Sequence, residues 1–299
     1  MSKYSKVRKN SSTSLKDTLG KVYSYIPNSP LVLDVGCSTG YFGELLIDDK
    51  KATVDGIELD SNDAAKARKV LNQVYSLDLE YDEWPKELLS TRYDVVFFGD
   101  ILEHLKDPGK VLEKFSKLLK RSGIVIISIP NIAHASVRFD LLAGNFDYEE
   151  LGILDNTHLK YFTFSSFTRL LGESGYKLID YDQSTVAMPR DTAEKILDNL
   201  GLVANEKFYD RMLEPDATAF QYKIVAKVGK MKAPPKLAKK TLETAKRQAV
   251  KVQELYSKIN ELNNKLEKTE QELLGTHGSI SWRITKPLRK AKRVVKGKK

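Results

Sequence analysis

The chain has 299 residues, of which 30% are charged and 41% hydrophobic, a composition typical of a globular protein with a polar extension. A single cysteine, Cys37, excludes an intramolecular disulfide and suits a reducing compartment. The net charge of +9 is uneven, because from Lys230 onward 20 basic residues face 6 acidic ones, whereas residues 1–229 hold 29 basic and 34 acidic residues. A polyanionic partner, if one exists, is therefore expected at the C-terminal part.

The sequence contains no segment typical of export or membrane insertion. The basic residues of 1–20, expected to be a flexible N-terminal segment, lead into no apolar run like that of a secretory signal. No stretch of about 18 apolar residues follows. We therefore expect a cytoplasmic protein.

Apolar runs alternate with amphipathic stretches between residues 31 and 130, which predicts a parallel sheet covered on both faces. Two later apolar runs lack a full crossover pattern and predict an antiparallel closing strand. The expected fold class is α/β, a Rossmann-like, seven-stranded, mostly parallel sheet over residues 21–229. The predicted strands are 31–36, 52–59, 73–79, 93–100, 123–130, 175–182 and 220–228, and the predicted helices are 41–49, 61–71, 107–121 and 191–200.

The C-terminal part is predicted to form a helical extension. Residues 230–240 read as a linker, because Pro234 and Pro235 interrupt regular structure. Within 241–275, apolar-type residues follow a heptad spacing that predicts a coiled coil, with a single helix docked on the core as the alternative. The positions that carry this spacing are Val252, Leu255, Ile259, Leu262, Leu266, Thr269 and Leu273.

The last 24 residues, 276–299, form a basic amphipathic tail with nine Lys and Arg, no acidic residue, and Trp282 as an aromatic anchor. This composition favours either peripheral contact with anionic lipid on the inner face of the cell membrane or a solvated tail. The coiled coil is expected to join copies of the chain or to bind a glycosyltransferase. Nucleic acid is an improbable partner because residues 1–229 are acidic overall.

The stretch "VLDVGCSTGYFGELL" places three glycines between an apolar run and a predicted helix. Its glycines, Gly36, Gly40 and Gly43, do not match the G-x-G-x-x-G spacing of a dinucleotide site. A phosphate-binding loop is also excluded, because no Lys followed by Ser or Thr comes after the last glycine. Such spacing leaves room for a ligand without a phosphate cradle.

This stretch resembles the first motif of class I S-adenosylmethionine-dependent methyltransferases, and the resemblance covers roughly residues 30–230. It implies S-adenosyl-L-methionine as cofactor, with Asp34 near the methionine amino group and Glu58, 22 residues after Gly36, on the ribose hydroxyls. Asp78 would lie near the adenine and Asp100 near the methionine end. The cofactor-binding residues that it implies are Asp34, Gly36, Cys37, Gly40, Tyr41, Glu58, Leu59, Asp78, Leu79, Asp100 and His104.

Two later segments narrow the resemblance to a subgroup. "GDILEHLKDPGKVLEKF" is similar to ubiquinone-biosynthesis methyltransferases, some of which bind a metal at positions matching Asp100, Glu103 and His104; we expect no metal here. "LLAGNFDYEELGILDNTHLKYFT" and the ending "GSISWRITKPLR" resemble methyltransferases of bacterial surface-polysaccharide biosynthesis, such as O-antigen or capsule. The resemblance therefore implies an O-methyltransferase that acts on a glycan or lipid-linked glycan, with chain capping as its expected role.

A sugar hydroxyl needs a base to accept its proton, and histidine suits that task. His158 is the preferred catalytic residue, followed by His134, with His104 as a further candidate. Alternatively, His158 fixes its loop by hydrogen bonds to backbone carbonyls. Two other functions stay open: a small-molecule or RNA O-methyltransferase, and a non-catalytic scaffold of a glycan-assembly complex.

Overall fold

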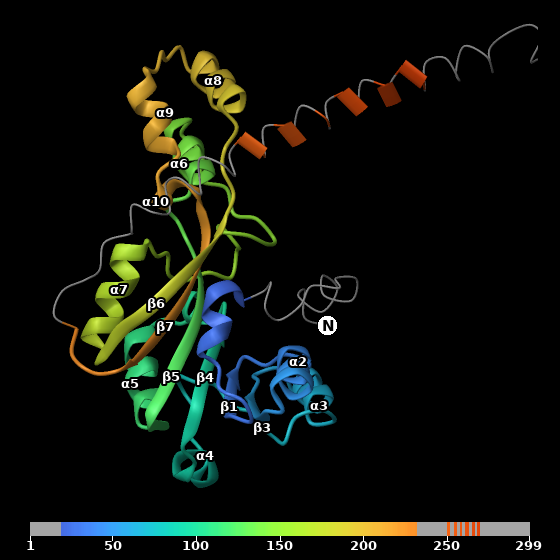
Figure 1. The fold of residues 1–299 in the computed structure, drawn as a ribbon, viewed down its shortest axis with the longest axis vertical. Helices are drawn as coiled ribbons and strands as arrows, with labels where there is room; N and C mark the ends of the chain where they lie inside the picture. Colours follow the sequence, from blue (N-terminus) through green and yellow to red (C-terminus); the bar gives the residue numbers. More distant parts are fainter. Residues whose placement is uncertain are drawn as a thin grey trace, which may run out of the picture. The chain divides into compact units, whose positions relative to one another are not determined.

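The computed structural model describes residues 19–231 and, farther along, helical positions 250–251, 254–255, 258, 261–262, 265–266 and 268–269. The chain divides into two compact units, residues 1–249 and 250–299. The centre of the first unit is a seven-stranded sheet of order β3-β2-β1-β4-β5-β7-β6 (Figure 1). Its strands are β1 (Leu31–Val35), β2 (Thr53–Ile57), β3 (Gln73–Tyr75), β4 (Tyr93–Gly99), β5 (Leu119–Pro130), β6 (Tyr176–Thr185) and β7 (Ala219–Val228).

The strand directions confirm the predicted mostly parallel sheet. Strands β1 to β5 pair in parallel, whereas β7 pairs antiparallel with both β5 and β6. The registers of Asp34 with Phe97 and of Gly99 with Ser128 bring the carboxyl ends of β1, β4 and β5 to one edge. Ligands bind at such an edge in open α/β sheets.

Helices cover both faces of the sheet and one of its ends (Figure 1). The helical elements are η3 (Gly20–Tyr25), α2 (Tyr41–Lys50), α3 (Ser61–Ala67), α4 (Lys86–Ser90), η4 (Leu102–His104), α5 (Pro108–Ser116), α6 (Ala135–Leu142), α7 (Phe164–Glu173), α8 (Arg190–Asn199), α9 (Glu206–Met212) and α10 (Pro215–Thr218). No helix in the described part of the chain has the length and apolarity needed to cross a membrane.

The buried apolar residues form one core on each face, because the central strands are apolar in both directions. One core packs α5 and α7 against β4, β5 and β7, and includes Phe98, Phe115 and Phe167. The other packs η3, α2 and α3 against the opposite face and includes Val32 and Phe97. A smaller cluster joins α6, α8 and α9 beyond the carboxyl end of β5.

Local side chains explain where several helices begin. Asp60 caps α3 by accepting hydrogen bonds from the backbone of Asn62 and Asp63 at 2.9 Å. Thr163 and Ser166 form a reciprocal capping box at the start of α7. The helix predicted over 107–121 ends at Ser116, because β5 begins at Leu119 and pairs with Tyr93 of β4. This boundary of the sequence prediction was therefore wrong.

Three predicted segments lie wholly or largely outside the described residues: the N-terminal segment up to residue 18, the linker from 232 and the tail 276–299. Leu19, expected in the flexible N-terminus, is 2% exposed and packs in the core, so the ordered fold begins earlier than predicted. The described positions of the predicted coiled coil are helical and expose Leu255, Leu262 and Leu266. Its other heptad residues, Val252, Ile259 and Leu273, lie outside the described part.

Replacing Thr163 by Ala is expected to lower the free energy of unfolding by about 1 kcal/mol, because the start of α7 loses its side-chain acceptor. Urea unfolding followed by circular dichroism measures the change. Ser165→Ala, on an exposed position of the same helical turn, is the matched control and should change stability by less than about 0.5 kcal/mol. Equal effects of both substitutions would contradict the capping role.

Candidate functional site

The loop after β1 runs through the carboxyl edge of the sheet at a glycine with a left-handed backbone conformation. Gly36 has φ +72°, and a Cβ at this position would stand 2.1 Å from Cδ1 of Ile101. The amides of Gly36 and Cys37 both donate to the carbonyl oxygen of Ile57, at 2.8 and 3.0 Å. The loop is therefore held between β2 and the segment after β4.

Gly40 is the N-cap residue of α2, the helix that follows this loop. It has φ +84° at the N-cap of α2, and a Cβ there would stand 3.2 Å from Cα of Ala67 on α3. Gly40 lines neither of the cavities described below, so its contribution here is to begin α2 close to α3.

Two cavities open at this edge and share Gly36, Gly99 and Asp100. The larger cavity has a volume of ≈ 470 Å³ and lies at the ends of β1, β2 and β3. Of the predicted cofactor residues, it is lined by Gly36, Glu58, Leu59, Asp78, Leu79, Asp100 and His104. The smaller cavity, ≈ 260 Å³, is lined by the predicted residues Asp34, Gly36, Cys37, Tyr41 and Asp100.

Glu58 follows β2 and is fixed by the backbone. Its Oε2 accepts a hydrogen bond from the Ser38 amide at 2.7 Å, and its Oε1 accepts one from the Asp60 amide at 2.9 Å. Each carboxylate oxygen retains a further acceptor site. Glu58 can therefore accept two ligand hydroxyls while it orders the glycine loop.

Asp100 follows β4 in a left-handed conformation, with φ +56°. Its Oδ1 accepts hydrogen bonds from Ser128 of β5 and Gln221 of β7, both at 2.7 Å. Such backbone strain in a residue other than glycine is typical of functional sites, where the surrounding structure holds it. The network leaves Oδ2 with no protein partner within the described residues.

Cys37 lines the smaller cavity as an apolar group. Its side chain is 4% exposed, and burial together with the Asp34 carboxylate raises the pKa of the thiol above its ordinary value. The thiol is therefore not ionised near pH 7 and is no nucleophile.

His104 is the histidine that faces the larger cavity. Its Nδ1 lies 3.1 Å from the carbonyl oxygen of Thr157 and 3.2 Å from Oγ1 of Thr157. That hydroxyl donates its own proton to Oδ1 of Asp155 at 2.6 Å, so both neighbours of Nδ1 are acceptors. In the neutral ring Nδ1 therefore carries the proton and Nε2 carries the lone pair.

The two histidines preferred from the sequence line neither cavity. His158 is 7% exposed, and its Nδ1 donates to the carbonyl oxygen of Ile153 at 2.9 Å. His134 caps α6, and its Nε2 donates to the carbonyl oxygen of Val186 at 2.7 Å. Burial lowers the pKa of both rings. Both histidines thus donate hydrogen bonds to backbone carbonyl groups, which is the alternative role that the sequence left open for His158.

The profile of the family described as "Methyltransferase domain" matches residues 7–181, more than half of the chain. The chain belongs to this methyltransferase family. A solved structure of a SAM-dependent methyltransferase from Archaeoglobus fulgidus shares the fold, with a TM-score of 0.50 at 19% identity over 71% of this chain and 92% of that one. The methyltransferase class expected from the sequence is confirmed, and the fold is that of a SAM-dependent methyltransferase.

Curated relatives of this methyltransferase carry the name "Ubiquinone biosynthesis O-methyltransferase". The relative from Acinetobacter baylyi is 28% identical over 50% of this chain and 64% of its own length. The relative from Leptothrix cholodnii is 28% identical over 55% of this chain and 69% of its own. The chain thus spans about two thirds of these relatives, and 58% of the relative from Psychrobacter arcticus.

The residues of this methyltransferase fit its cofactor. Gly36 lines both cavities, and its left-handed backbone, with φ +72°, lets the loop turn between them without a side chain. A carboxylate with acceptor sites to spare, Glu58, lines the larger cavity, and the nearly buried Asp34 lines the smaller one. The donor set of the site therefore suits a ligand with ribose hydroxyls and a cationic end.

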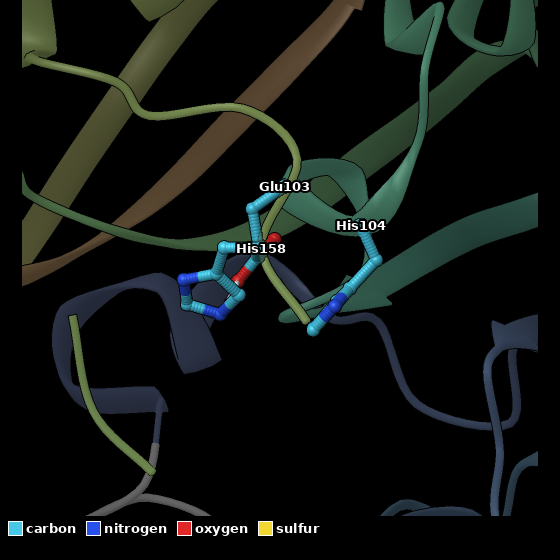
Figure 2. A group of neighbouring side chains, drawn as sticks. All are labelled: Glu103, His104 and His158. Atoms are coloured by element: carbon cyan, nitrogen blue, oxygen red, sulfur yellow. Dashed lines mark ion pairs between the residues drawn. The ribbon is translucent and has the colours of Figure 1, made fainter. Parts of the chain in front are cut away.

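One group of metal-ligand type occurs within the described residues: Glu103, His104 and His158, whose ligand atoms lie within 4.8 Å of one another. Glu103 and His104 come from η4, and His158 from a separate loop (Figure 2). Asp100, the third residue of the metal set considered from the sequence, is not part of this group.

Glu103 is buried without a hydrogen bond to either carboxylate oxygen. Burial, followed by the nearby Asp100 charge, raises its pKa well above the ordinary value, so the carboxyl keeps its proton to a higher pH than an exposed glutamate does. His158 Nε2 stands 4.0 Å from its Oε1. A cation bound here would have to displace that proton.

Glu103→Gln is expected to flatten the pH dependence of stability above the ordinary glutamate pKa of 4.5. The folded state keeps the Glu103 proton and the unfolded state loses it, so this residue lowers the free energy of unfolding as pH rises. The wild type should lose up to about 1.4 kcal/mol per pH unit relative to the variant. Urea unfolding between pH 5 and 6.5 measures this difference; parallel curves would show that the pKa of Glu103 is not raised in the folded protein.

Proposed function

We propose that this methyltransferase transfers a methyl group to a hydroxyl of a small acceptor, with His104 as the general base. The orientation of His104 carries the proposal, because hydrogen bonding to Thr157 leaves its Nε2 lone pair available at the larger cavity. A base within reach of a hydroxyl contributes roughly 10²–10⁴-fold to the rate.

The chain would bind the cofactor across the shared edge of the two cavities. Glu58 would accept the ribose hydroxyls, and Asp78 with Leu79 would border the adenine. Asp34 and the loop at Gly36 would hold the methionine end, beside Cys37 and Tyr41. The remaining residues proposed from the sequence are Leu59, which lines the larger cavity, and Gly40, which supports the loop.

When bound, the cofactor supplies an already electrophilic methyl group, so the protein has to align the acceptor and accept its proton. Nε2 of His104 would take that proton. Thr157 would hold the ring in the required tautomer, and Asp155, whose Oδ1 accepts from both the amide and the hydroxyl of Thr157, would hold Thr157. Thr157 and Asp155 are thus positioning residues.

The names of the relatives support a small-molecule acceptor such as a phenol, the alternative drawn from the sequence, rather than a polysaccharide. A glycan or lipid-linked glycan is the second candidate, favoured by the resemblance of residues 141–163 and of the ending "GSISWRITKPLR". The segments proposed to bind a membrane or a glycosyltransferase lie largely outside the described residues. We therefore make a catechol the first acceptor to test.

Glu58→Ala is expected to weaken S-adenosylmethionine binding at least about tenfold, since the ribose loses a charged acceptor and the amides of Ser38 in the glycine loop and of Asp60 lose theirs. Isothermal titration calorimetry measures the affinity. Glu83→Ala, an exposed acid of the neighbouring loop, is the control and should bind as the wild type does. Equal affinity of both variants would remove Glu58 from the cofactor site.

His104→Gln is expected to lower kcat for catechol by roughly 10²–10⁴-fold and to abolish the acidic limb of the pH–rate profile, because that limb reports protonation of the base. Release of S-adenosylhomocysteine measures the rate. His158→Gln is the matched control, and it should reduce stability while the limb persists.

The opposite result, with the acidic limb lost in His158→Gln and kept in His104→Gln, would assign the base to His158. A wild type that binds the cofactor but methylates neither catechol nor a sugar hydroxyl would contradict the proposed transfer to oxygen.

A further inference from the structure

Lys223 is a buried lysine that faces the smaller cavity. It lies in the middle of β7, its residue is 8% exposed, and it lines the cavity together with Ser128 and Gln221. Lysine is almost never this deeply buried without a partner, because removing an ammonium group from water is costly. Burial accordingly lowers the pKa of Lys223, while Asp182 and Asp100 oppose that shift.

No acid of the described residues forms an ion pair or hydrogen bond with Lys223. Asp182 stands directly opposite on β6, but its Oδ2 accepts from the Lys21 amide at 2.6 Å and its Oδ1 from the Gln183 amide at 2.9 Å. Asp100 is held by Ser128 and Gln221. The ammonium group of Lys223 is therefore left for a ligand.

The position of Lys223 in the sheet separates it from the cofactor residues. Asp34 and Glu58 end β1 and β2, whereas Lys223 is on β7, three strands beyond β1 in the order β1-β4-β5-β7. Strands are spaced by about 4.8 Å, so β7 lies roughly 14 Å from β1. The amino and carboxylate groups of methionine share one carbon atom, so a cofactor whose ammonium lies at Asp34 does not bring its carboxylate to β7.

The smaller cavity is thus polarised across the sheet. Its β1 end carries the Asp34 carboxylate and meets the larger cavity at Gly36, and its β7 end carries a lysine. Apolar and aromatic residues make up much of the remaining lining, namely Leu19, Tyr41, Phe42, Leu45 and Phe97. A flat ring with a negative group at its far side matches this arrangement.

We propose that the smaller cavity binds the acceptor, with the acceptor hydroxyl at the rim shared with the larger cavity, toward His104, and that Lys223 recognises a carboxylate or phosphate group carried by that acceptor. The inference rests on the proposed methyl transfer and specifies its substrate class, an anionic small molecule with a hydroxyl. An ammonium acts on such an anion as a point charge, and Gln221 and Ser128 flank it with polar groups.

The test compares two probes that share a ring and two hydroxyls, 3,4-dihydroxybenzoate and catechol. Isothermal titration uses the full chain saturated with S-adenosylhomocysteine. The wild type is expected to bind the benzoate roughly tenfold or more tightly than catechol, the gain of one charge-assisted hydrogen bond. Lys223→Met keeps the apolar stem but should bind the two probes about equally, whereas Lys223→Arg should retain the preference.

Lys227→Met, on the same strand but outside the cavity, is the control and should keep the wild-type preference. Equal binding of both probes to the wild type, or a preference that survives Lys223→Met, would overturn the inference. Loss of S-adenosylhomocysteine binding in Lys223→Met would also overturn it, because the lysine would then serve the cofactor's carboxylate.

The decarboxylated analogue of S-adenosylhomocysteine is the control for that last outcome. Because it has no carboxylate, Lys223→Met should leave its affinity unchanged whether or not the lysine binds the carboxylate of the cofactor. Binding and turnover separate the two proposals. A Lys223-dependent preference without methylation of either probe would leave the anion site intact and contradict the proposed methyl transfer. Methylation of catechol without any preference for the benzoate would support the proposed methyl transfer and contradict the anion site.

Discussion

The contact between the Gly36 backbone and Ile101 is the constraint on which this site depends. A side chain at Gly36 would be strained by its φ of +72° and would displace the Ile101 side chain, because a Cβ would stand 2.1 Å from Cδ1 of Ile101. The loop after β1 can therefore lie directly against the segment after β4, and the two cavities meet there. The residues predicted to bind the cofactor, at the ends of β1 to β3, and polar residues on β5 and β7 thereby border one edge of the sheet.

Polar networks hold the far side of that edge. Asp100 connects β4 to β5 and β7 through Ser128 and Gln221. The loop of residues 153–160 is tied to η4, because the carbonyl oxygen of Glu103 accepts the amides of Leu159 and Lys160 at 2.8 and 2.9 Å. This attachment places Thr157 beside His104. The tautomer of the proposed base is thus a consequence of how a separate loop is anchored.

Glu103 and Lys223 are two buried ionisable groups whose shortest ion-pair contact within the described residues is the 4.0 Å between Glu103 and His158, and they have different consequences. Glu103 lines neither cavity, and burial raises its pKa, so its cost depends on pH. Lys223 faces a cavity and can be compensated by a ligand. The two groups differ in their exposure to a cavity. Glu103 lacks it and affects stability, whereas Lys223 has it and can recognise an anion.

The sequence by itself determined the sheet, its closing antiparallel strand and most of the cofactor edge, because near-continuous apolar runs and the acids that follow them are local patterns. Only the tertiary structure decided which histidine faces the cavity, since the orientation of His104 depends on Thr157, 53 residues away. Lys223 gave no local signal, because "QYKIVAKV" reads as a strand with an ordinary lysine. Its burial depends on the packing of η3 and β6 around β7, which no periodicity within the strand encodes.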